Sequence, residues 1–192
     1  MKKALFISML VTIGIIVCSC GQKNPKATSN TNNNATSTTN NNTVSNTSNN
    51  STANGTFNAS GTITFTVGGI NYSCSISKVI AASTSLTIHT STADVRTNGS
   101  IIITCYTATS AINTGAYTAS SSEAISSVSY IDKNVTPYTA TAITSGSNCT
   151  VNITALTSTS IKGTFTATVL EPIDNSALII TDGVIDCTIT SK

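Results

Sequence analysis

The sequence contains no tryptophan, only three prolines and one histidine, and charged residues make up 8% of its 192 positions. One histidine cannot build a multi-histidine metal site, and no serine stands in a Gly-x-Ser-x-Gly motif. The net charge is +2, and no basic cluster of the kind that binds nucleic acid is present. We therefore expect a protein that is not an enzyme, with no catalytic residues, no metal, no cofactor and no nucleic-acid partner.

Long apolar runs are also lacking. The longest, Ala4 to Val17, follows two lysines and is too short to be a comfortable membrane span, which is typical of a signal peptide. The segment Val17-Cys18-Ser19-Cys20 resembles the box that ends the signal of bacterial lipoproteins, with small Ser19 before the acceptor cysteine. We expect a signal peptide over 1–19, a lipid (palmitate) on Cys20, and Cys18 discarded. An ordinary secretory signal with an incidental cysteine is the alternative.

Residues 20–55 consist almost entirely of Asn, Thr and Ser after the lipidated cysteine. Such a segment cannot bury enough apolar surface to offset the entropy of ordering, so we expect a disordered tether. Two or more acyl chains hold a protein stably on a bilayer. The partner expected first is therefore a membrane, reached through the lipid anchor. The location expected is the bacterial cell envelope, at the outer membrane, with the periplasmic and surface faces both open.

From 56 to 192 the composition changes to alternating aliphatic or aromatic residues and Thr or Ser. Period-two patterns such as "GTITFTV" and "INYSCSISK" predict strands, and Gly68-Gly69 between them predicts a two-residue hairpin turn. Asp182-Gly183 looks like a second tight turn. About ten short strands without helical periodicity predict an all-β domain, an antiparallel β-sandwich or a partly closed barrel.

Four cysteines of this domain fall on the apolar register of their strands: Cys74, Cys105, Cys149 and Cys187. We expect them to point into the core and to be oxidised in two disulfides, since the outside of a bacterial membrane permits oxidation. A zinc site is the rival, but the close cysteine pairs of such sites are missing. Consecutive elements are more often neighbours, which favours Cys74 with Cys105 and Cys149 with Cys187, although sequence alone cannot decide the connectivity.

The remaining polar and aromatic candidate residues have ordinary structural explanations. His89 lies on the polar register of its strand and is expected at the surface. The domain's acids are scattered, mostly beside turns. A converging pair would suit a glycosidase, and Asp182 with Asp186 could bind calcium with carbonyls. Tyrosines are normal strand residues but could form a sugar-stacking platform; they are Tyr72, Tyr106, Tyr117, Tyr130 and Tyr138.

A lipobox cysteine, a polar linker, a start "GTITFTVGGINYSC", a middle "GAYT" and an end "GTFTAT" followed by "LIITDGVIDCTI" together resemble small Bacteroidetes-type lipoproteins. Their C-terminal β domain has no known function. Gly163-Thr164-Phe165 and Thr181-Asp182-Gly183 match the recurring landmarks of that group. The resemblance implies an all-β lipoprotein and brings no catalytic residues. The acidic run that often follows the lipidated cysteine of surface-exported lipoproteins is missing here.

Three functions from different classes follow as expectations. The first is a membrane-anchored binding or interaction module that recognises an envelope glycan, a peptide or another envelope protein. The second is a structural or accessory lipoprotein without a ligand, and the third is a carboxylate-based hydrolase. Binding is favoured because a braced β scaffold with polar loops suits recognition, while the sequence offers no catalytic constellation. Exposed coplanar tyrosines would favour binding, and a cleft with two facing carboxylates would favour hydrolysis.

Overall fold

Alternating apolar and hydroxyl-bearing residues make this chain a series of strands, because successive side chains of a strand point to opposite faces. The computed structural model describes residues 54–93 and 95–190; the predicted signal peptide, Cys20 and nearly all of the tether lie outside this part. No helix of the described residues is long and apolar enough to cross a membrane. The elements are β1 (Gly55–Val67), β2 (Ile70–Ala82), β3 (Ser85–Thr90), α1 (Val95–Asn98), β4 (Ser100–Thr107), β5 (Gly115–Thr118), β6 (Ala124–Ile131), β7 (Pro137–Ala140), β8 (Asn148–Leu156), β9 (Ser160–Leu170) and β10 (Ala177–Thr190).

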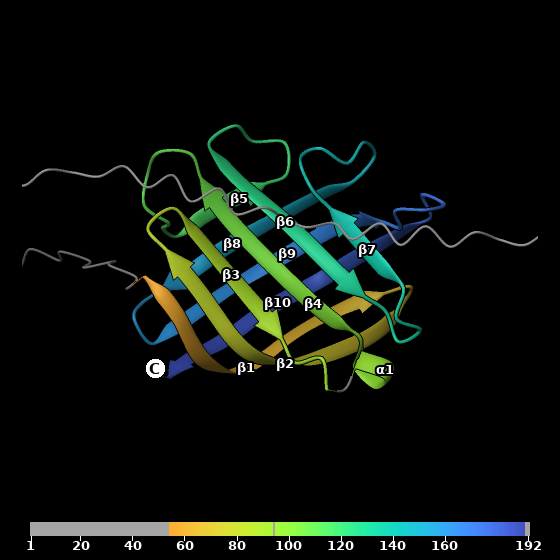
Figure 1. Cartoon of the computed structure of the whole chain (residues 1–192), viewed down its shortest axis with the longest axis horizontal. Coiled ribbons are helices and arrows are strands. Elements are labelled where there is room, and N and C mark those ends of the chain that lie inside the picture. Colours follow the sequence, from red (N-terminus) through yellow and green to blue (C-terminus); the bar gives the residue numbers. More distant parts are fainter. Residues whose placement is uncertain (1–53, 94, 191–192) are drawn as a thin grey trace, which may run out of the picture. The chain divides into compact units, whose positions relative to one another are not determined.

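The strands form one antiparallel sheet that closes on itself (Figure 1). Its hydrogen-bonded order is β10-β1-β2-β3-β4-β6-β7-β9, and β9 pairs with β10 to complete an eight-stranded barrel. The β8 strand pairs with β9, and β5 pairs with β8, as additional strands. A single pair, Thr139 with Leu170, joins β7 to β9. The expected all-β antiparallel class is confirmed, and the sheet is closed.

The barrel interior holds the apolar register of every long strand. Ile63, Ile101, Val151 and Ile161 are among the side chains with no more than 1% exposure, and all four domain cysteines are buried with them. An aromatic cluster lies in the same core, made of Phe65, Tyr72, Tyr130, Tyr138 and Phe165. The inward orientation expected for the cysteines is confirmed.

The two predicted turns have different outcomes. Gly68 and Gly69 join β1 to β2 with φ of 58° and 80°, the left-handed conformation that a two-residue hairpin turn needs. The prediction of a turn at Asp182-Gly183 is wrong. Both residues lie inside β10, where the pairing with β9 shifts between Ile180 and Gly183, so the extra residue forms a β-bulge rather than a reversal.

The antiparallel order assigns each connection to one end of the barrel. The connections β1–β2, β3–β4, β6–β7 and β9–β10 lie at one end, here called the β1–β2 end (Figure 1). The start of β1 at Gly55 and the connections β2–β3 and β8–β9 lie at the opposite end. Loop 141–147 turns the chain from short β7 into β8, beside the end of β9.

Candidate binding face

The outer surface of β8, β9, β10, β1 and β2 is lined by short polar side chains. Because residues alternate between the two sides of a strand, each buried position is flanked by exposed hydroxyl or amide groups. The outward positions are Thr150 and Asn152 on β8, Thr164, Thr166 and Thr168 on β9, Thr181 and Asp182 on β10, Thr64 and Thr66 on β1, and Asn71 and Ser73 on β2. We call this surface the threonine face.

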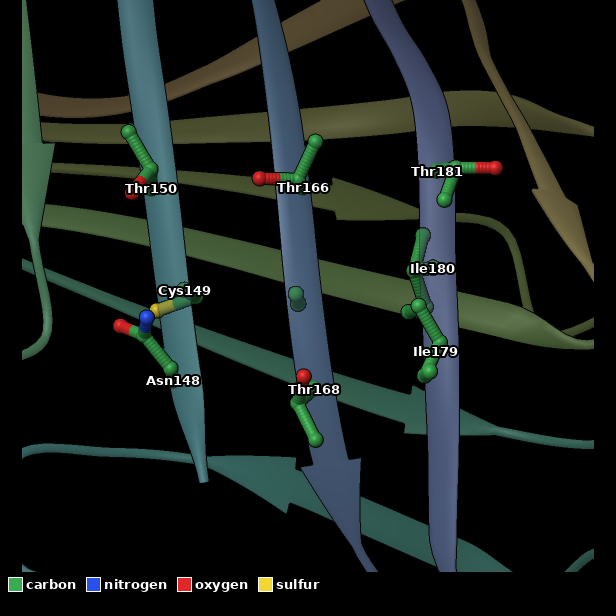
Figure 2. A pocket seen from close by; sticks show the side chains of 9 residues that line it. Asn148, Cys149, Thr150, Thr166, Thr168, Ile179, Ile180 and Thr181 are labelled. Carbon is green, nitrogen blue, oxygen red and sulfur yellow. The ribbon is translucent and has the colours of Figure 1, made fainter. Parts of the chain in front are cut away.

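A hollow of about 230 Å³ crosses three strands of this face. Figure 2 shows its lining, with Thr150 on β8, Thr166 and Thr168 on β9, and Thr181 on β10. Ile179, which is 64% exposed, adds an aliphatic patch at one side. The hollow is therefore lined by hydroxyl groups with one apolar contact surface.

Two further hollows continue the first one along the face. One of about 460 Å³ shares Thr150 and Thr166 with it and extends to Asp182. The other, of about 380 Å³, lies between β1 and β2, is lined by Asn71 and Tyr72, and also reaches Asp182. Asp182 is the carboxylate common to both hollows, so the three hollows adjoin one another along the face, and apolar side chains such as Phe65 and Phe165 contribute to their lining.

The bulge in β10 determines the position of Asp182. The bulge places Thr181 and Asp182 at consecutive exposed positions, whereas the rest of the strand alternates. Asp182 has φ of 53°, a left-handed conformation that Asp adopts more readily than most residues. Its Oδ2 accepts a hydrogen bond of 2.9 Å from Thr181 Oγ1. The carboxylate is thus oriented before any ligand binds.

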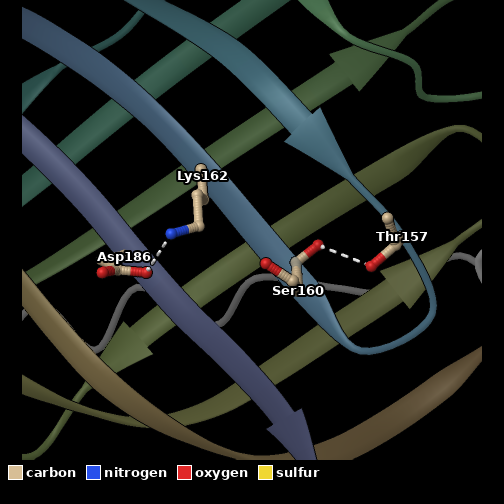
Figure 3. A network of polar contacts seen from close by, with 4 residues as sticks. All are labelled: Thr157, Ser160, Lys162 and Asp186. Atoms are coloured by element: carbon tan, nitrogen blue, oxygen red, sulfur yellow. Dashed lines mark hydrogen bonds and ion pairs between the residues drawn. The ribbon is translucent and has the colours of Figure 1, made fainter.

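The threonine face carries little net charge. Lys162 and Asp186 are direct cross-strand neighbours, and Lys162 Nζ lies 3.3 Å from Asp186 Oδ1 (Figure 3). No lysine, arginine or histidine lines any of the three hollows described above. A ligand of this surface therefore meets neutral hydroxyl and amide groups, apolar and aromatic side chains, and one carboxylate. The possible calcium site at Asp182 and Asp186 gains no support, because Asp186 forms an ion pair with Lys162.

The four cysteines of the domain are buried, and no disulfide joins them. Burial raises the pKa of Cys74 and Cys187 to about 11; burial, together with the nearby Cys149, raises that of Cys105 to about 12. Burial also raises the pKa of Cys149. Within the described residues, no group of three or more His, Cys, Asp or Glu side chains is placed to hold a metal ion.

Strand register bears on which cysteines could pair. On β9, Cys149 is level with Ala167, and Cys187 is level with Ile161. These levels are six residues apart, which separates the two cysteines by about 20 Å. Across β3, Cys105 is level with Ala81, and Cys74 lies seven residues further along β2, about 23 Å away. Disulfides join Cα atoms within about 7 Å.

The preference for Cys74 with Cys105 and Cys149 with Cys187 is therefore wrong, because the register of intervening strands holds each pair far apart. The structure instead brings Cys105 near Cys149. Ser126 is the cross-strand partner of Cys105, and its Oγ lies 3.2 Å from Cys149 Sγ. Oxidation of the cysteines stays a prediction, and Cys105–Cys149 is the pairing that this arrangement favours.

The other predicted candidates are dispersed. Tyr117 and Tyr130 are buried, Tyr72 and Tyr138 are half-buried, and Tyr106 is exposed by itself, so these tyrosines form no exposed coplanar pair. His89 is half-buried rather than fully solvated, and its pKa is lowered by burial and by Lys78.

The acids do not form a facing pair in a cleft among the hollows described above, which contain only Asp182. The Glu171 carboxylate instead accepts hydrogen bonds from the backbone of its own loop. Its Oε2 accepts hydrogen bonds from the backbone N–H of Ile173 at 3.1 Å and of Asp174 at 2.7 Å. Sequence reasoning placed Asp182 in a turn and missed its position inside β10, since a bulge and a turn share the same Asp-Gly signal.

No protein-family model, curated protein or solved structure matches the chain. Its function therefore has to be inferred from the residues and their arrangement.

Proposed function

We propose that this protein is a membrane-anchored lipoprotein of the bacterial cell envelope whose β domain binds a neutral glycan on the threonine face. The observation that carries the ligand class is a row of three adjoining hollows. Hydroxyl groups, amide groups and the carboxylate of Asp182 line them together with apolar side chains such as Phe165 and Val184. The anchor rests on the lipobox at Cys20.

The chemistry of the lining supports a sugar over other ligand classes. Sugar hydroxyls both donate and accept hydrogen bonds, as threonine hydroxyls and asparagine amides do, and a carboxylate accepts bonds from two hydroxyls at once. An anionic ligand would meet Asp182 with no cation in the hollows to offset it. The exposed aliphatic side chains of Ile179 and Val184 would contact the C–H faces of sugar rings.

The two other functions have less support. Hydrolysis of a glycosidic bond normally uses two carboxyl groups on either side of the bond, and one carboxylate cannot supply both roles. A purely structural role would need no row of adjoining hollows that carry hydroxyl and amide groups. We therefore place binding first, with an accessory role as the result expected if no glycan binds.

A glycan array tests the ligand with the chain from Gly21 to Lys192, which contains the whole barrel. We expect binding to neutral oligosaccharides, and at least tenfold weaker binding after Thr166→Val, which keeps the side-chain shape but removes the hydroxyl group. Thr154→Val is the matched control, since Thr154 is exposed on β8 outside the hollows. Equal losses in both variants, or no binding by the wild type, would refute the glycan proposal.

Membrane fractionation tests the anchor separately. Cys20→Ser should release the mature protein from the detergent phase, whereas Cys18→Ser should leave it there, because only the first change removes the acylated residue. Retention of the Cys20→Ser variant would contradict the lipoprotein proposal and leave the glycan proposal untouched.

A further inference from the structure

The two ends of the barrel differ in the side chains that they expose. At and beside the β1–β2 end, four aliphatic side chains are exposed, one at the start of β2 and three in separate connections: Ile70 (56% exposed), Val135 (48%), Ile143 (95%) and Ile173 (90%). We call these four residues the aliphatic rim. At the opposite end, connections 83–84 and 157–159 contain only Ser and Thr, and the isoleucine of connection 108–114, Ile112, is buried.

The two most exposed members of the rim lie on neighbouring loops. Ile143 lies in loop 141–147 and Ile173 in loop 171–176. The pair Thr139 with Leu170 joins the strands from which both loops begin. The position of a Cβ on Gly146 would lie 3.5 Å from Leu170 Cδ1, so the first loop packs against the base of the second. Figure 1 shows both loops on the same side of the barrel.

Val135 is held exposed in an unfavourable backbone conformation. Its φ is 67°, in the left-handed region that glycine or asparagine occupies easily and that a β-branched residue rarely adopts. Two hydrogen bonds to Asp132 close the turn. Val135 N–H donates to Asp132 O at 2.9 Å, and Thr136 N–H donates to Asp132 Oδ1 at 2.8 Å. These bonds do not depend on the side chain at position 135, so the hydrogen bonding of the turn does not require an aliphatic group there.

The carboxylates near the rim are engaged in their own loops. Asp132 Oδ1 accepts the Thr136 bond and another of 2.9 Å from Asn134 N–H. Asp174 Oδ1 accepts one of 2.7 Å from Ser176 N–H, and Glu171 caps the same loop. These acids are therefore compatible with a headgroup region, but they outnumber Lys133 and Arg96 at this end. Anionic lipids would be repelled, and zwitterionic lipids would not.

We propose that the aliphatic rim inserts into the surface of a bilayer with zwitterionic headgroups. The four side chains come from separate segments of the chain, and none of them lines any of the three hollows described above. A protein partner would need a matching cavity for each tip, whereas fluid hydrocarbon fills the space around isolated aliphatic groups without such a match.

The length of the chain before the barrel is compatible with this orientation. Gly55 begins β1 at the end away from the rim. From Cys20 to Gly55 an extended chain spans up to about 120 Å, and the 13 residues of β1 span only about 43 Å. A lipid on Cys20 would therefore not prevent the rim from reaching the same membrane, and the insertion itself does not depend on that lipid.

Flotation with vesicles tests the rim in the absence of the anchor. The unlipidated chain from Gly21 to Lys192 is mixed with phosphatidylcholine–phosphatidylethanolamine vesicles. We expect the wild type to float with the vesicles, and the bound fraction of the Ile143→Asn/Ile173→Asn double variant to fall at least tenfold. Ile80→Asn is the control, because Ile80 is 38% exposed on the wall of β2. No flotation of the wild type, or equal losses in control and double variant, would overturn the proposal.

Val135→Gly separates lipid contact from a structural role. Glycine relieves the left-handed strain, so the variant should melt at the same or a higher temperature while binding vesicles several-fold more weakly. Unchanged vesicle binding would remove Val135 from the rim and overturn the proposal as stated. The last experiment measures the oligomeric state of the wild type by sedimentation without lipid. A dimer that the Ile143→Asn/Ile173→Asn variant no longer forms would identify the rim as a contact between copies of this chain and overturn the lipid proposal.

Discussion

Ser126 joins two parts of the β domain that no backbone ladder connects. Strands β5 and β6 are not hydrogen-bonded partners in the sheet order. Ser126 on β6 is 1% exposed, and its single hydroxyl proton is shared between two acceptors, the carbonyl oxygen of Tyr117 on β5 at 3.0 Å and that of Cys149 on β8 at 3.3 Å. Ser126→Ala removes these bonds with almost no change in volume.

The expected loss of stability in Ser126→Ala depends on the hydrogen bonds that the two carbonyl groups retain. The Cys149 carbonyl still accepts a bond of 3.0 Å from Ala119 N–H, and Tyr117 remains paired with Val151 in the β5–β8 ladder. The variant therefore leaves no newly orphaned carbonyl, and only the net value of the serine bonds is lost. The shared proton amounts to about one hydrogen bond, so the free energy of unfolding should fall by about 1 kcal/mol. In a domain of this size the melting temperature should fall by about 4 °C.

Urea unfolding of matched variants measures this loss. Ser127→Ala is the control, because Ser127 is the next residue, is half-buried on the other face of β6, and lies opposite Thr104. We expect its free energy of unfolding to change by less than about 0.5 kcal/mol. Hydrogen exchange should show faster opening of β5 in Ser126→Ala alone. Equal losses in the two variants, or an unchanged Ser126→Ala protein, would refute the role of Ser126 across the junction.

Three further outcomes are expected. Gly183→Ala would bring its Cβ into a steric clash with the carbonyl oxygen of Phe165, so urea unfolding should show a loss of about 1–3 kcal/mol, and a variant as stable as the wild type would contradict this close approach. In reduced protein, the raised thiol pKa values and burial predict that iodoacetamide at pH 8 alkylates the domain cysteines only after unfolding; rapid labelling of the folded protein would contradict this. The pKa of His89 is lowered by folding, so the folded state disfavours the imidazolium, and stability should fall as the pH drops below about 6.5 and through the folded-state pKa. His89→Gln should reduce that pH dependence, and urea midpoints between pH 7 and pH 5 that match those of the wild type would show that His89 does not contribute.

Much of the local structure could be predicted because the signals are local. Alternation with period two identified the strands and showed that Cys74, Cys105, Cys149 and Cys187 face inward. Two consecutive glycines identified the β1–β2 turn, since their φ values of 58° and 80° are difficult for other residues. Each of these features depends on a residue and its nearest neighbours, which a sequence displays directly.

The candidate sites depended on pairing between distant strands. The threonine face joins β8, β9 and β10 to β1, and residues 64 and 182 line one hollow although they are far apart in sequence. A bulge decided that Asp182 lies within a strand, and the same Asp-Gly pair would suit a turn, so the sequence could not distinguish the two. The register across β3 and β9 separated the cysteines that chain order had paired.

By itself the sequence determined the class of the fold and which side chains enter the core, because burial along a strand follows a two-residue period that side-chain chemistry makes visible. Only the tertiary structure decided that the sheet closes through β9 and β10, that Cys105 approaches Cys149, and that Ile143 and Ile173 lie on neighbouring loops. These contacts arise from strand order and register, which are set by the packing of all strands around one core and have no local signature.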